Sequence, residues 1–199
     1  MSKQKPSEPI SKRKLKGDSL SSLQTDIVKF LAENKPKTIN EISKVLSKDY
    51  KSIYRSFDSL QKKKLVSEVD AKNYRGNKYA LFWLSVDGMV LALLGGADHV
   101  ILLENAKEIF PDLEIVHCFL EVMQLLDSTM LELAHDIVKK KGTIEFVELV
   151  TILFSGSLDA DEEKMKLIVS VLKKYPDQYD QLKILIRAII EKLNQLIAD

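Results

Sequence analysis

His117, Cys118 and His135 are the residue types in this sequence best suited to bind a metal ion or to react with an oxidant. Apolar residues recur at helical spacing around them, which predicts one long helix over residues 113–140. In a straight helix the two histidines would lie about 27 Å apart at the usual rise per residue, too far to share one ion. We therefore expect no metal site. We expect Cys118 to be a small buried apolar residue, with a redox-sensing thiol as the alternative.

Other arrangements that carry catalysis or bind cofactors are absent from the sequence. It has no glycine-rich phosphate loop, no His-Glu-x-x-His segment and no cysteine pair for zinc. The acidic run at Asp159, Asp161, Glu162 and Glu163 lacks the spacing of a calcium loop and is typical of acidic residues at a helix N-terminus. We expect no catalytic residues, no cofactor and no enzyme activity.

Basic residues are concentrated in the first half of the chain. Residues 1–85 carry 19 Lys and Arg residues against nine Asp and Glu, a net charge of +10, whereas residues 86–199 carry 11 against 20, a net charge of −9. This asymmetry indicates an N-terminal half that meets a polyanion. A lysine-rich, solvated surface is the alternative interpretation.

Composition places the chain among globular proteins. Its 199 residues are 45% hydrophobic and 30% charged, enough apolar mass for one domain or two small ones. The single cysteine favours a reducing compartment, and no apolar stretch is long enough for a membrane span or a signal peptide. We expect a soluble cytoplasmic protein. Residues 1–18, rich in Lys, Pro and Ser, are expected to be a flexible basic arm.

The first helices have clear start and stop signals. Ser21 or Ser22 is suited to cap a first helix. Pro36 ends that helix because its ring clashes with a continuing one. Thr38 followed by Glu41 is a capping-box pattern, which predicts the start of a second helix.

A third helix and a hairpin follow. The apolar residues of the third helix lie three and four positions apart, at Ile53, Phe57 and Leu60. Tyr50 is expected at the edge of the core. Strands are predicted over residues 65–70 and 79–84, with a polar turn over residues 71–77 that contains a Gly-Asn pair. Three helices and a β-hairpin describe a winged helix.

From Ser85 onward every segment has a helical pattern. Ser85 is suited to cap a helix that ends at Gly95, and a helix from His99 stops before Pro111. After the long helix, further helices are predicted over residues 144–154, 162–174 and 179–197. We therefore expect a mostly α-helical protein, with a winged helix over residues 19–94 and an all-helical domain over residues 95–199.

Several N-terminal segments resemble winged helix-turn-helix transcription regulators of the MarR-like and ArsR-like types. The similarity covers about residues 21–94 and rests on five segments in the family's order: 38–46, 52–60, 62–66, 79–81 and 84–88. Lys64 stands where such regulators usually have glycine, so strain or a different cap is expected there. The resemblance implies binding to double-stranded DNA, and it does not extend to the C-terminal half.

The residue pattern agrees with this resemblance. With the apolar side of the third helix in the core, the outer side would enter a major groove, with Lys51 and Ser52 at base edges and Arg55 at bases or phosphate. Tyr54 could donate its hydroxyl to a phosphate or touch a thymine methyl. Arg75 is suited to a minor groove. The full set of expected DNA contacts is Lys48, Lys51, Ser52, Tyr54, Arg55, Lys62, Lys72, Arg75 and Lys78.

The C-terminal helices have broad apolar faces, which are expected to be buried within one bundle or between two chains. We expect a homodimer through these helices, because two-fold pairing doubles the DNA contact of one winged helix. No residue indicates a small-molecule effector. The alternative function is a winged-helix module that binds proteins of the transcription or replication machinery.

Overall fold

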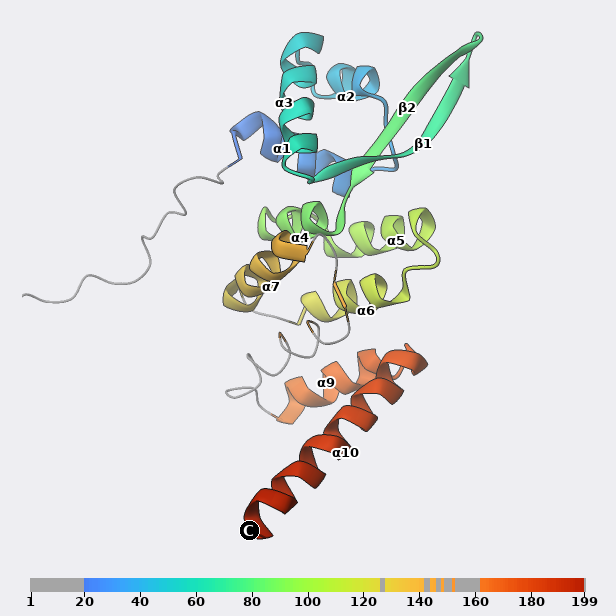
Figure 1. Cartoon of the computed structure of the whole chain (residues 1–199). Coiled ribbons are helices and arrows are strands. Elements are labelled where there is room, and N and C mark those ends of the chain that lie inside the picture. Colours follow the sequence, from blue (N-terminus) through green and yellow to red (C-terminus); the bar gives the residue numbers. More distant parts are fainter. Residues whose placement is uncertain are drawn as a thin grey trace, which may run out of the picture.

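The structure is a computed structural model, and it describes residues 20–125, 128–141, 144, 145, 148, 152 and 162–198 (Figure 1). The predicted basic arm, most of the predicted helix over residues 144–154, and Asp159 and Asp161 lie outside these residues. None of the helices in the described ranges has the length and apolar character that a bilayer crossing requires.

Three helices open the fold as predicted: α1 (Ser22–Ala32), α2 (Ile39–Val45) and α3 (Tyr50–Lys62). The two predicted caps are confirmed. The hydroxyl oxygen of Ser21 accepts from the backbone N–H of Gln24, and Thr38 and Glu41 form the reciprocal bonds of a capping box. Each cap pairs backbone N–H groups that the start of a helix leaves without a partner, so the local sequence sets where α1 and α2 begin.

The hairpin consists of β1 (Val66–Tyr74) and β2 (Asn77–Leu84), paired antiparallel. The prediction of a polar turn over residues 71–77 was wrong, because the ladder continues to the pair of Tyr74 and Asn77. Arg75 and Gly76 alone form the tip, with φ angles of 50° and 79°. Positive φ at both central residues matches the twist of a hairpin, so a two-residue turn suffices. Both faces of this end of the hairpin are exposed. The sequence there therefore lacks the alternation of apolar and polar residues from which strands are predicted.

The base of the hairpin is fixed to α1. Lys37 and Phe82 exchange backbone hydrogen bonds of 3.2 and 3.0 Å, which adds a one-residue third strand. The indole N–H of the fully buried Trp83 donates to the carbonyl oxygens of Leu31 and Asn34, at 2.6 and 2.9 Å. These bonds satisfy carbonyls at the end of α1 and hold β2 against it.

The apolar side of α3 fills the centre of the winged helix. Ile53, Phe57 and Leu60 are fully buried, as predicted, and the ring of Phe57 meets that of Phe82 edge-on at 4.9 Å. The prediction that Tyr50 lies at the core edge was wrong. It is 50% exposed, because the first turn of α3 extends past the core and places Tyr50 beside Tyr54 instead.

A close backbone contact joins the winged helix to α4 (Val86–Leu94). A Cβ atom on Gly88 would lie 2.1 Å from the carbonyl oxygen of Leu65, so only glycine fits at this position. Ser85 caps α4, as predicted, and its hydroxyl donates to the carbonyl oxygen of Lys64 at 2.7 Å. Lys64 itself has a φ of 59°, so the backbone strain expected at this position is present.

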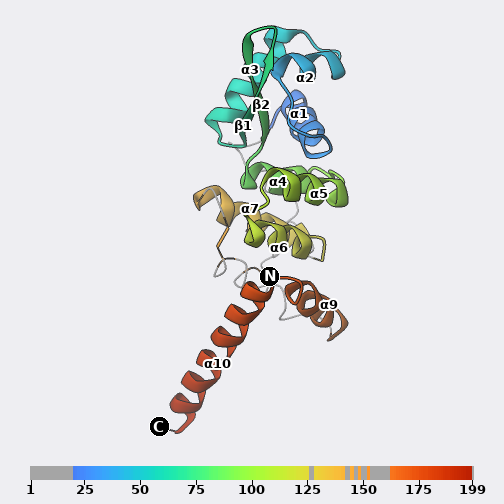
Figure 2. The ribbon, with the colours of Figure 1, turned by 90° about the vertical axis from the view of Figure 1, so that its right-hand side faces the viewer.

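The remaining described helices stack below the winged helix in layers (Figures 1 and 2): α5 (His99–Ile109), α6 (Glu114–Met123), α7 (Ser128–Lys141), α9 (Glu162–Leu172) and α10 (Pro176–Ala198). α4 and α5 form one layer and α6 and α7 the next. α10 leads away from the body to the C-terminus. Buried side chains continue from α1 to the start of α10. The domain boundary near Leu94 stays a prediction.

The prediction of a single long helix over residues 113–140 was wrong. α6 ends at Met123, and a turn bond joins the backbone N–H of Leu125 to the carbonyl of Val122. As two helices, the same apolar residues pack on different neighbours, α6 on α5 and α7 on α4.

Candidate nucleic-acid interface

The N-terminal end of α3 and the tip of the hairpin lie at the same end of the molecule, the end away from α10 (Figures 1 and 2). The core contact of Phe57 fixes the direction of α3, and the bonds of Trp83 fix the base of the hairpin. Two projecting elements therefore share one end of a packed scaffold, although about 20 residues of sequence separate them.

The front of α3 carries most of the predicted contacts on its surface. Lys48, Lys51, Tyr54 and Arg55 are exposed and Ser52 is half-buried. Within the described part of the chain, the three cations have no acidic partner. Side chains near the start of a helix are those that reach base edges when a helix enters a major groove.

Sequence reasoning missed Asp49, the N-cap of α3. Its carboxylate accepts from the backbone N–H of Ser52 at 2.9 Å. Hydrogen bonds from Ser52 hold the pKa of this exposed carboxyl below its ordinary value, so it stays charged. An Asp directly before the first helical residue is a standard start signal and would have identified it. A carboxylate at this position accepts a hydrogen bond from cytosine N4 and repels phosphate.

The wing divides into an acidic base and a basic tip. Glu68 and Asp70 are exposed near the base and line a shallow hollow together with Lys78, which lies next to the tip, and Arg75 is at the tip itself. The Arg75 guanidinium lies over the ring of Tyr74, with its carbon 5.1 Å from the ring centre. Only the outer part of the wing is therefore suited to an anion.

Two of the predicted contacts already have acidic partners. Lys72 lies 3.4 Å from Glu41, and bonds from Thr38, followed by Lys72, lower the pKa of that carboxyl despite its partial burial. Lys62 pairs with Asp58 at 2.6 Å, which raises the pKa of the lysine. Lys62 also lies at the opposite end of α3, beside the base of the hairpin, so the structure does not bring it to the front of the helix.

The histidines and the cysteine form no common site. His135 on α7 pairs with Asp87 on α4, with 2.9 Å between Nδ1 and Oδ1. His117 is buried on α6, and desolvation lowers its pKa. Cys118 is buried as predicted, and burial raises the pKa of its thiol to about 12, which disfavours the reactive thiolate. Among the described residues, no three His, Cys, Asp or Glu side chains are placed to hold a metal ion.

Glu121 is the centre of a second polar cluster, deep in the C-terminal half. Its carboxylate accepts from Lys107, Lys174 and Tyr175, each at 2.8 Å. Burial alone would raise its pKa, but these three donated bonds lower it to about 2. Both carboxylate oxygens accept bonds from within the protein, so this cluster fastens the turn between α9 and α10 to α5 and α6.

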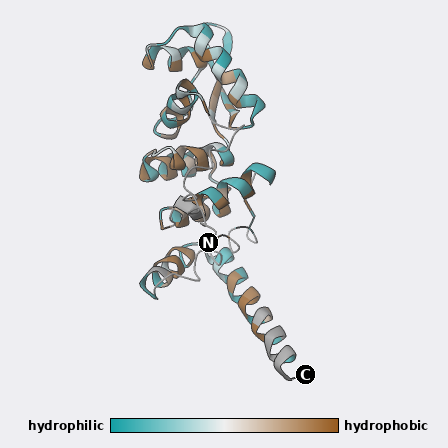
Figure 3. Ribbon diagram, turned by 90° about the vertical axis from the view of Figure 1, so that its left-hand side faces the viewer, coloured by the Kyte–Doolittle hydropathy of each residue, from teal (hydrophilic) through white to brown (hydrophobic). Residues whose placement is uncertain are grey.

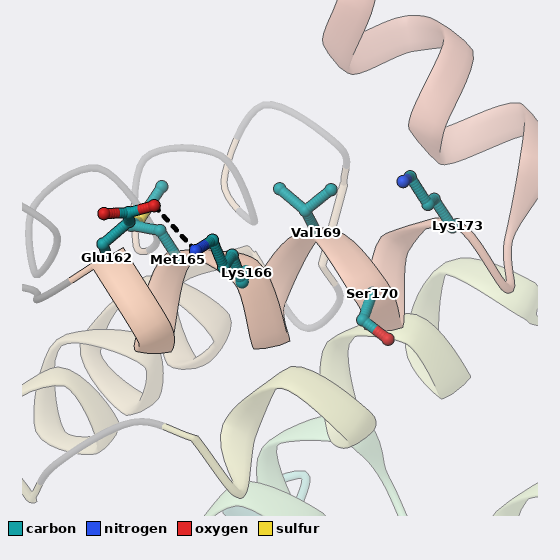
Figure 4. A pocket seen from close by; sticks show the side chains of 6 residues that line it. All are labelled: Glu162, Met165, Lys166, Val169, Ser170 and Lys173. Atoms are coloured by element: carbon teal, nitrogen blue, oxygen red, sulfur yellow. Dashed lines mark ion pairs between the residues drawn. The ribbon is translucent and has the colours of Figure 1, made fainter.

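A shallow hollow of about 450 Å³ runs along α9 (Figure 4). The described residues that line it are five residues of α9 and Lys173 directly after it, and Glu162 pairs with Lys166 at 2.7 Å. Binding sites usually combine polar groups from several elements, and the described lining of this hollow does not.

No model of a known protein family matches this chain, and no curated protein matches it either.

Proposed function

We propose that this protein is a sequence-specific regulator of transcription that binds double-stranded DNA. In this proposal α3 lies in the major groove, and the tip of the β1–β2 hairpin lies on the backbone or in a minor groove. The protein acts in the cytoplasm, without a cofactor or enzymatic activity.

One observation carries the proposal. The front of α3 and the wing tip share one end of the molecule, and both carry cations that have no acidic partner among the residues that the structure describes. A helix and a hairpin with unpaired cations at this end fit the major groove and an adjacent phosphate row. The proposed contacts are Lys48, Lys51, Ser52, Tyr54, Arg55, Arg75 and Lys78. Lys62 and Lys72 contribute only if DNA displaces their carboxylate partners.

The proposal includes a homodimer formed through the C-terminal helices. The apolar side of α10 that carries Ile186 and Ile190 is exposed in the single chain, with these two side chains 37% and 51% accessible (Figure 3). A second copy would cover this side and bring two winged helices onto one DNA, which doubles the contact.

The alternative, a module that binds proteins, is favoured by two observations. The carboxylate of Asp49 lies at the front of α3, and Val45 on α2 is 62% exposed. A protein partner would tolerate the charge and cover the valine.

A gel-shift series against genomic fragments, including the protein's own upstream region, tests the proposal. A dimer that neutralises 6–10 phosphates should lose about 10³–10⁵ in affinity between 50 and 200 mM salt. Binding that is absent, or that does not change with salt, would support the protein-binding alternative.

Two variants test which element reads sequence. Lys51→Ala and Ser52→Ala should each reduce the preference for a specific over a random duplex, by about 1–3 kcal/mol where the side chain makes a good hydrogen bond to a base. Lys173→Ala removes an exposed charge directly after α9, at the other end of the molecule, and is the matched control. An unchanged ratio in both α3 variants would exclude this helix as the reader.

A further inference from the structure

Two exposed tyrosines form a pair on the first turns of α3. Tyr50 and Tyr54 are one helical turn apart and are 50% and 54% exposed. Their rings are stacked, with 6.1 Å between the centroids and 28° between the planes. Two adjoining exposed rings form a larger apolar patch than a single surface residue does, and this patch lies at the front of the helix proposed to enter DNA.

The pair lines a small apolar hollow between two cations. The hollow has a volume of about 210 Å³, and its walls are Tyr50, Lys51, Tyr54 and Arg55. Its lining is almost entirely aromatic ring and aliphatic stem. The two cationic groups lie beside it without acidic partners in the described part of the chain. A ligand that matches this hollow has an apolar group for the rings and a negatively charged group close by for the two cations.

The major groove of DNA offers one such group. Each base pair presents hydrogen-bonding atoms there, and thymine alone adds an apolar one, its C5 methyl. We propose that thymine methyl groups pack against the Tyr50–Tyr54 pair, while Lys51 and Arg55 contact the flanking phosphates or base edges. This inference rests on the proposed function. The pair thereby selects thymine at the base steps that face the first turn of α3.

The wing tyrosines do not have this arrangement. The ring of Tyr74 is covered by Arg75, and Tyr79, 43% exposed, has no aromatic neighbour among the described residues. Tyr79→Ala is therefore a matched control, because it deletes an exposed tyrosine side chain of the same winged helix.

The experiment compares two duplex polymers that differ only in the methyl group, poly(dA-dT) and poly(dA-dU), with the full-length protein at fixed low salt. Burying one methyl-sized group is worth about a fourfold change in affinity, so the wild type should bind the thymine polymer about fourfold more tightly for each methyl that it buries. Tyr50→Ala and Tyr54→Ala should bring this ratio towards one. Tyr54→Phe, which keeps the ring, and Tyr79→Ala should retain it.

The variants separate methyl burial from DNA shape. Removing the methyl also alters the flexibility of the duplex, but that effect would persist in the alanine variants. A ratio that stays the same in Tyr50→Ala and Tyr54→Ala, or a wild-type ratio of one, overturns the inference and leaves DNA binding intact. No binding to either polymer at low salt overturns the proposed function, and the inference with it.

Discussion

The two ends of the molecule distribute apolar and charged residues in opposite ways. At the winged-helix end, Phe57 and Trp83 are fully buried, and the exposed front of α3 carries Lys51 and Arg55. On α10, apolar side chains such as Ile184 and Ile190 remain accessible in the single chain. The first end buries its large apolar side chains and exposes charge. The second offers apolar surface.

This difference separates two kinds of association. A charged surface attracts a polyanion in a way that salt weakens. An apolar helix face gains free energy by leaving water, and salt does not screen that gain. Proposing DNA for one end and a second copy for the other therefore makes predictions that can be tested separately, by changing one end and measuring both.

The largest expected effect is on the core of the winged-helix end. Phe57→Ala removes a fully buried ring and should lower the free energy of unfolding by about 3–5 kcal/mol, measured by urea denaturation. Tyr54→Ala, one turn earlier on the exposed side of α3, should change it by less than about 0.5 kcal/mol. Similar decreases in both variants would show that the two sides of α3 are assigned incorrectly.

The next largest effect is expected on α10. Ile186→Lys and Ile190→Lys place charge on its exposed apolar side and should weaken self-association at least tenfold in sedimentation or light-scattering experiments. Val100→Lys is the matched control, because Val100 is 60% exposed on α5, away from α10. A wild-type chain that is monomeric at high concentration, or equal weakening in all three variants, would contradict dimerisation through α10.

A third effect concerns the link between the two ends. Because the pKa of Glu121 is about 2 in the folded protein and ordinary in the unfolded chain, its stabilisation is complete above about pH 4.5 and is lost as the pH falls towards 2. Glu121→Gln should cost about 1–3 kcal/mol at neutral pH and flatten this pH dependence. Hydrogen exchange should then increase in α9 and α10 before it increases in α3.

Glu104→Gln is the control for this measurement, since Glu104 is an exposed residue of α5. It should leave both the stability and its pH profile unchanged. A Glu121→Gln protein with the wild-type acid profile would mean that this cluster does not fasten α9 and α10 to the body.

Much of the winged helix could be predicted because its signals are local. Ser21, Thr38 and Ser85 mark helix starts through bonds to residues three positions later, and Ile53 and Phe57 show their side of α3 by spacing. The strand ends of the wing could not be predicted, because both faces are exposed and no apolar alternation marks them.

The elements that were predicted wrongly depend on contacts that are distant in sequence. The break between α6 and α7 is favoured by packing on α5 and α4, and an apolar stripe does not show how many partners cover it. Exposure of Tyr50 depends on where the core ends, which the spacing of Ile53 alone does not set. The pairing of Lys72 with Glu41 spans 31 residues and has no local signal.

The smallest expected effect is at the tip of the wing, and it tests whether the charged end of the molecule includes the hairpin. Arg75 has a φ of 50°, and the carbon of its guanidinium lies 5.1 Å from the ring centre of Tyr74. Ala has a Cβ atom, as Arg has, and is equally disfavoured at this φ, so Arg75→Ala would remove the charge and leave the strain of the turn in place. Asn adopts positive φ readily and is favoured at this turn position, so Arg75→Asn removes the charge and keeps the hairpin.

If the tip lies on DNA, Arg75→Asn should weaken binding to specific and random duplexes alike. It should also reduce the slope of log affinity against log salt by about one, because neutralising one phosphate fewer releases one counterion fewer. Lys173→Ala, directly after α9, should leave the slope at its wild-type value. An unchanged slope in Arg75→Asn would place the wing away from the nucleic acid and restrict the DNA-binding end to the front of α3. Weaker binding to the specific duplex alone would instead mean that Arg75 reads bases.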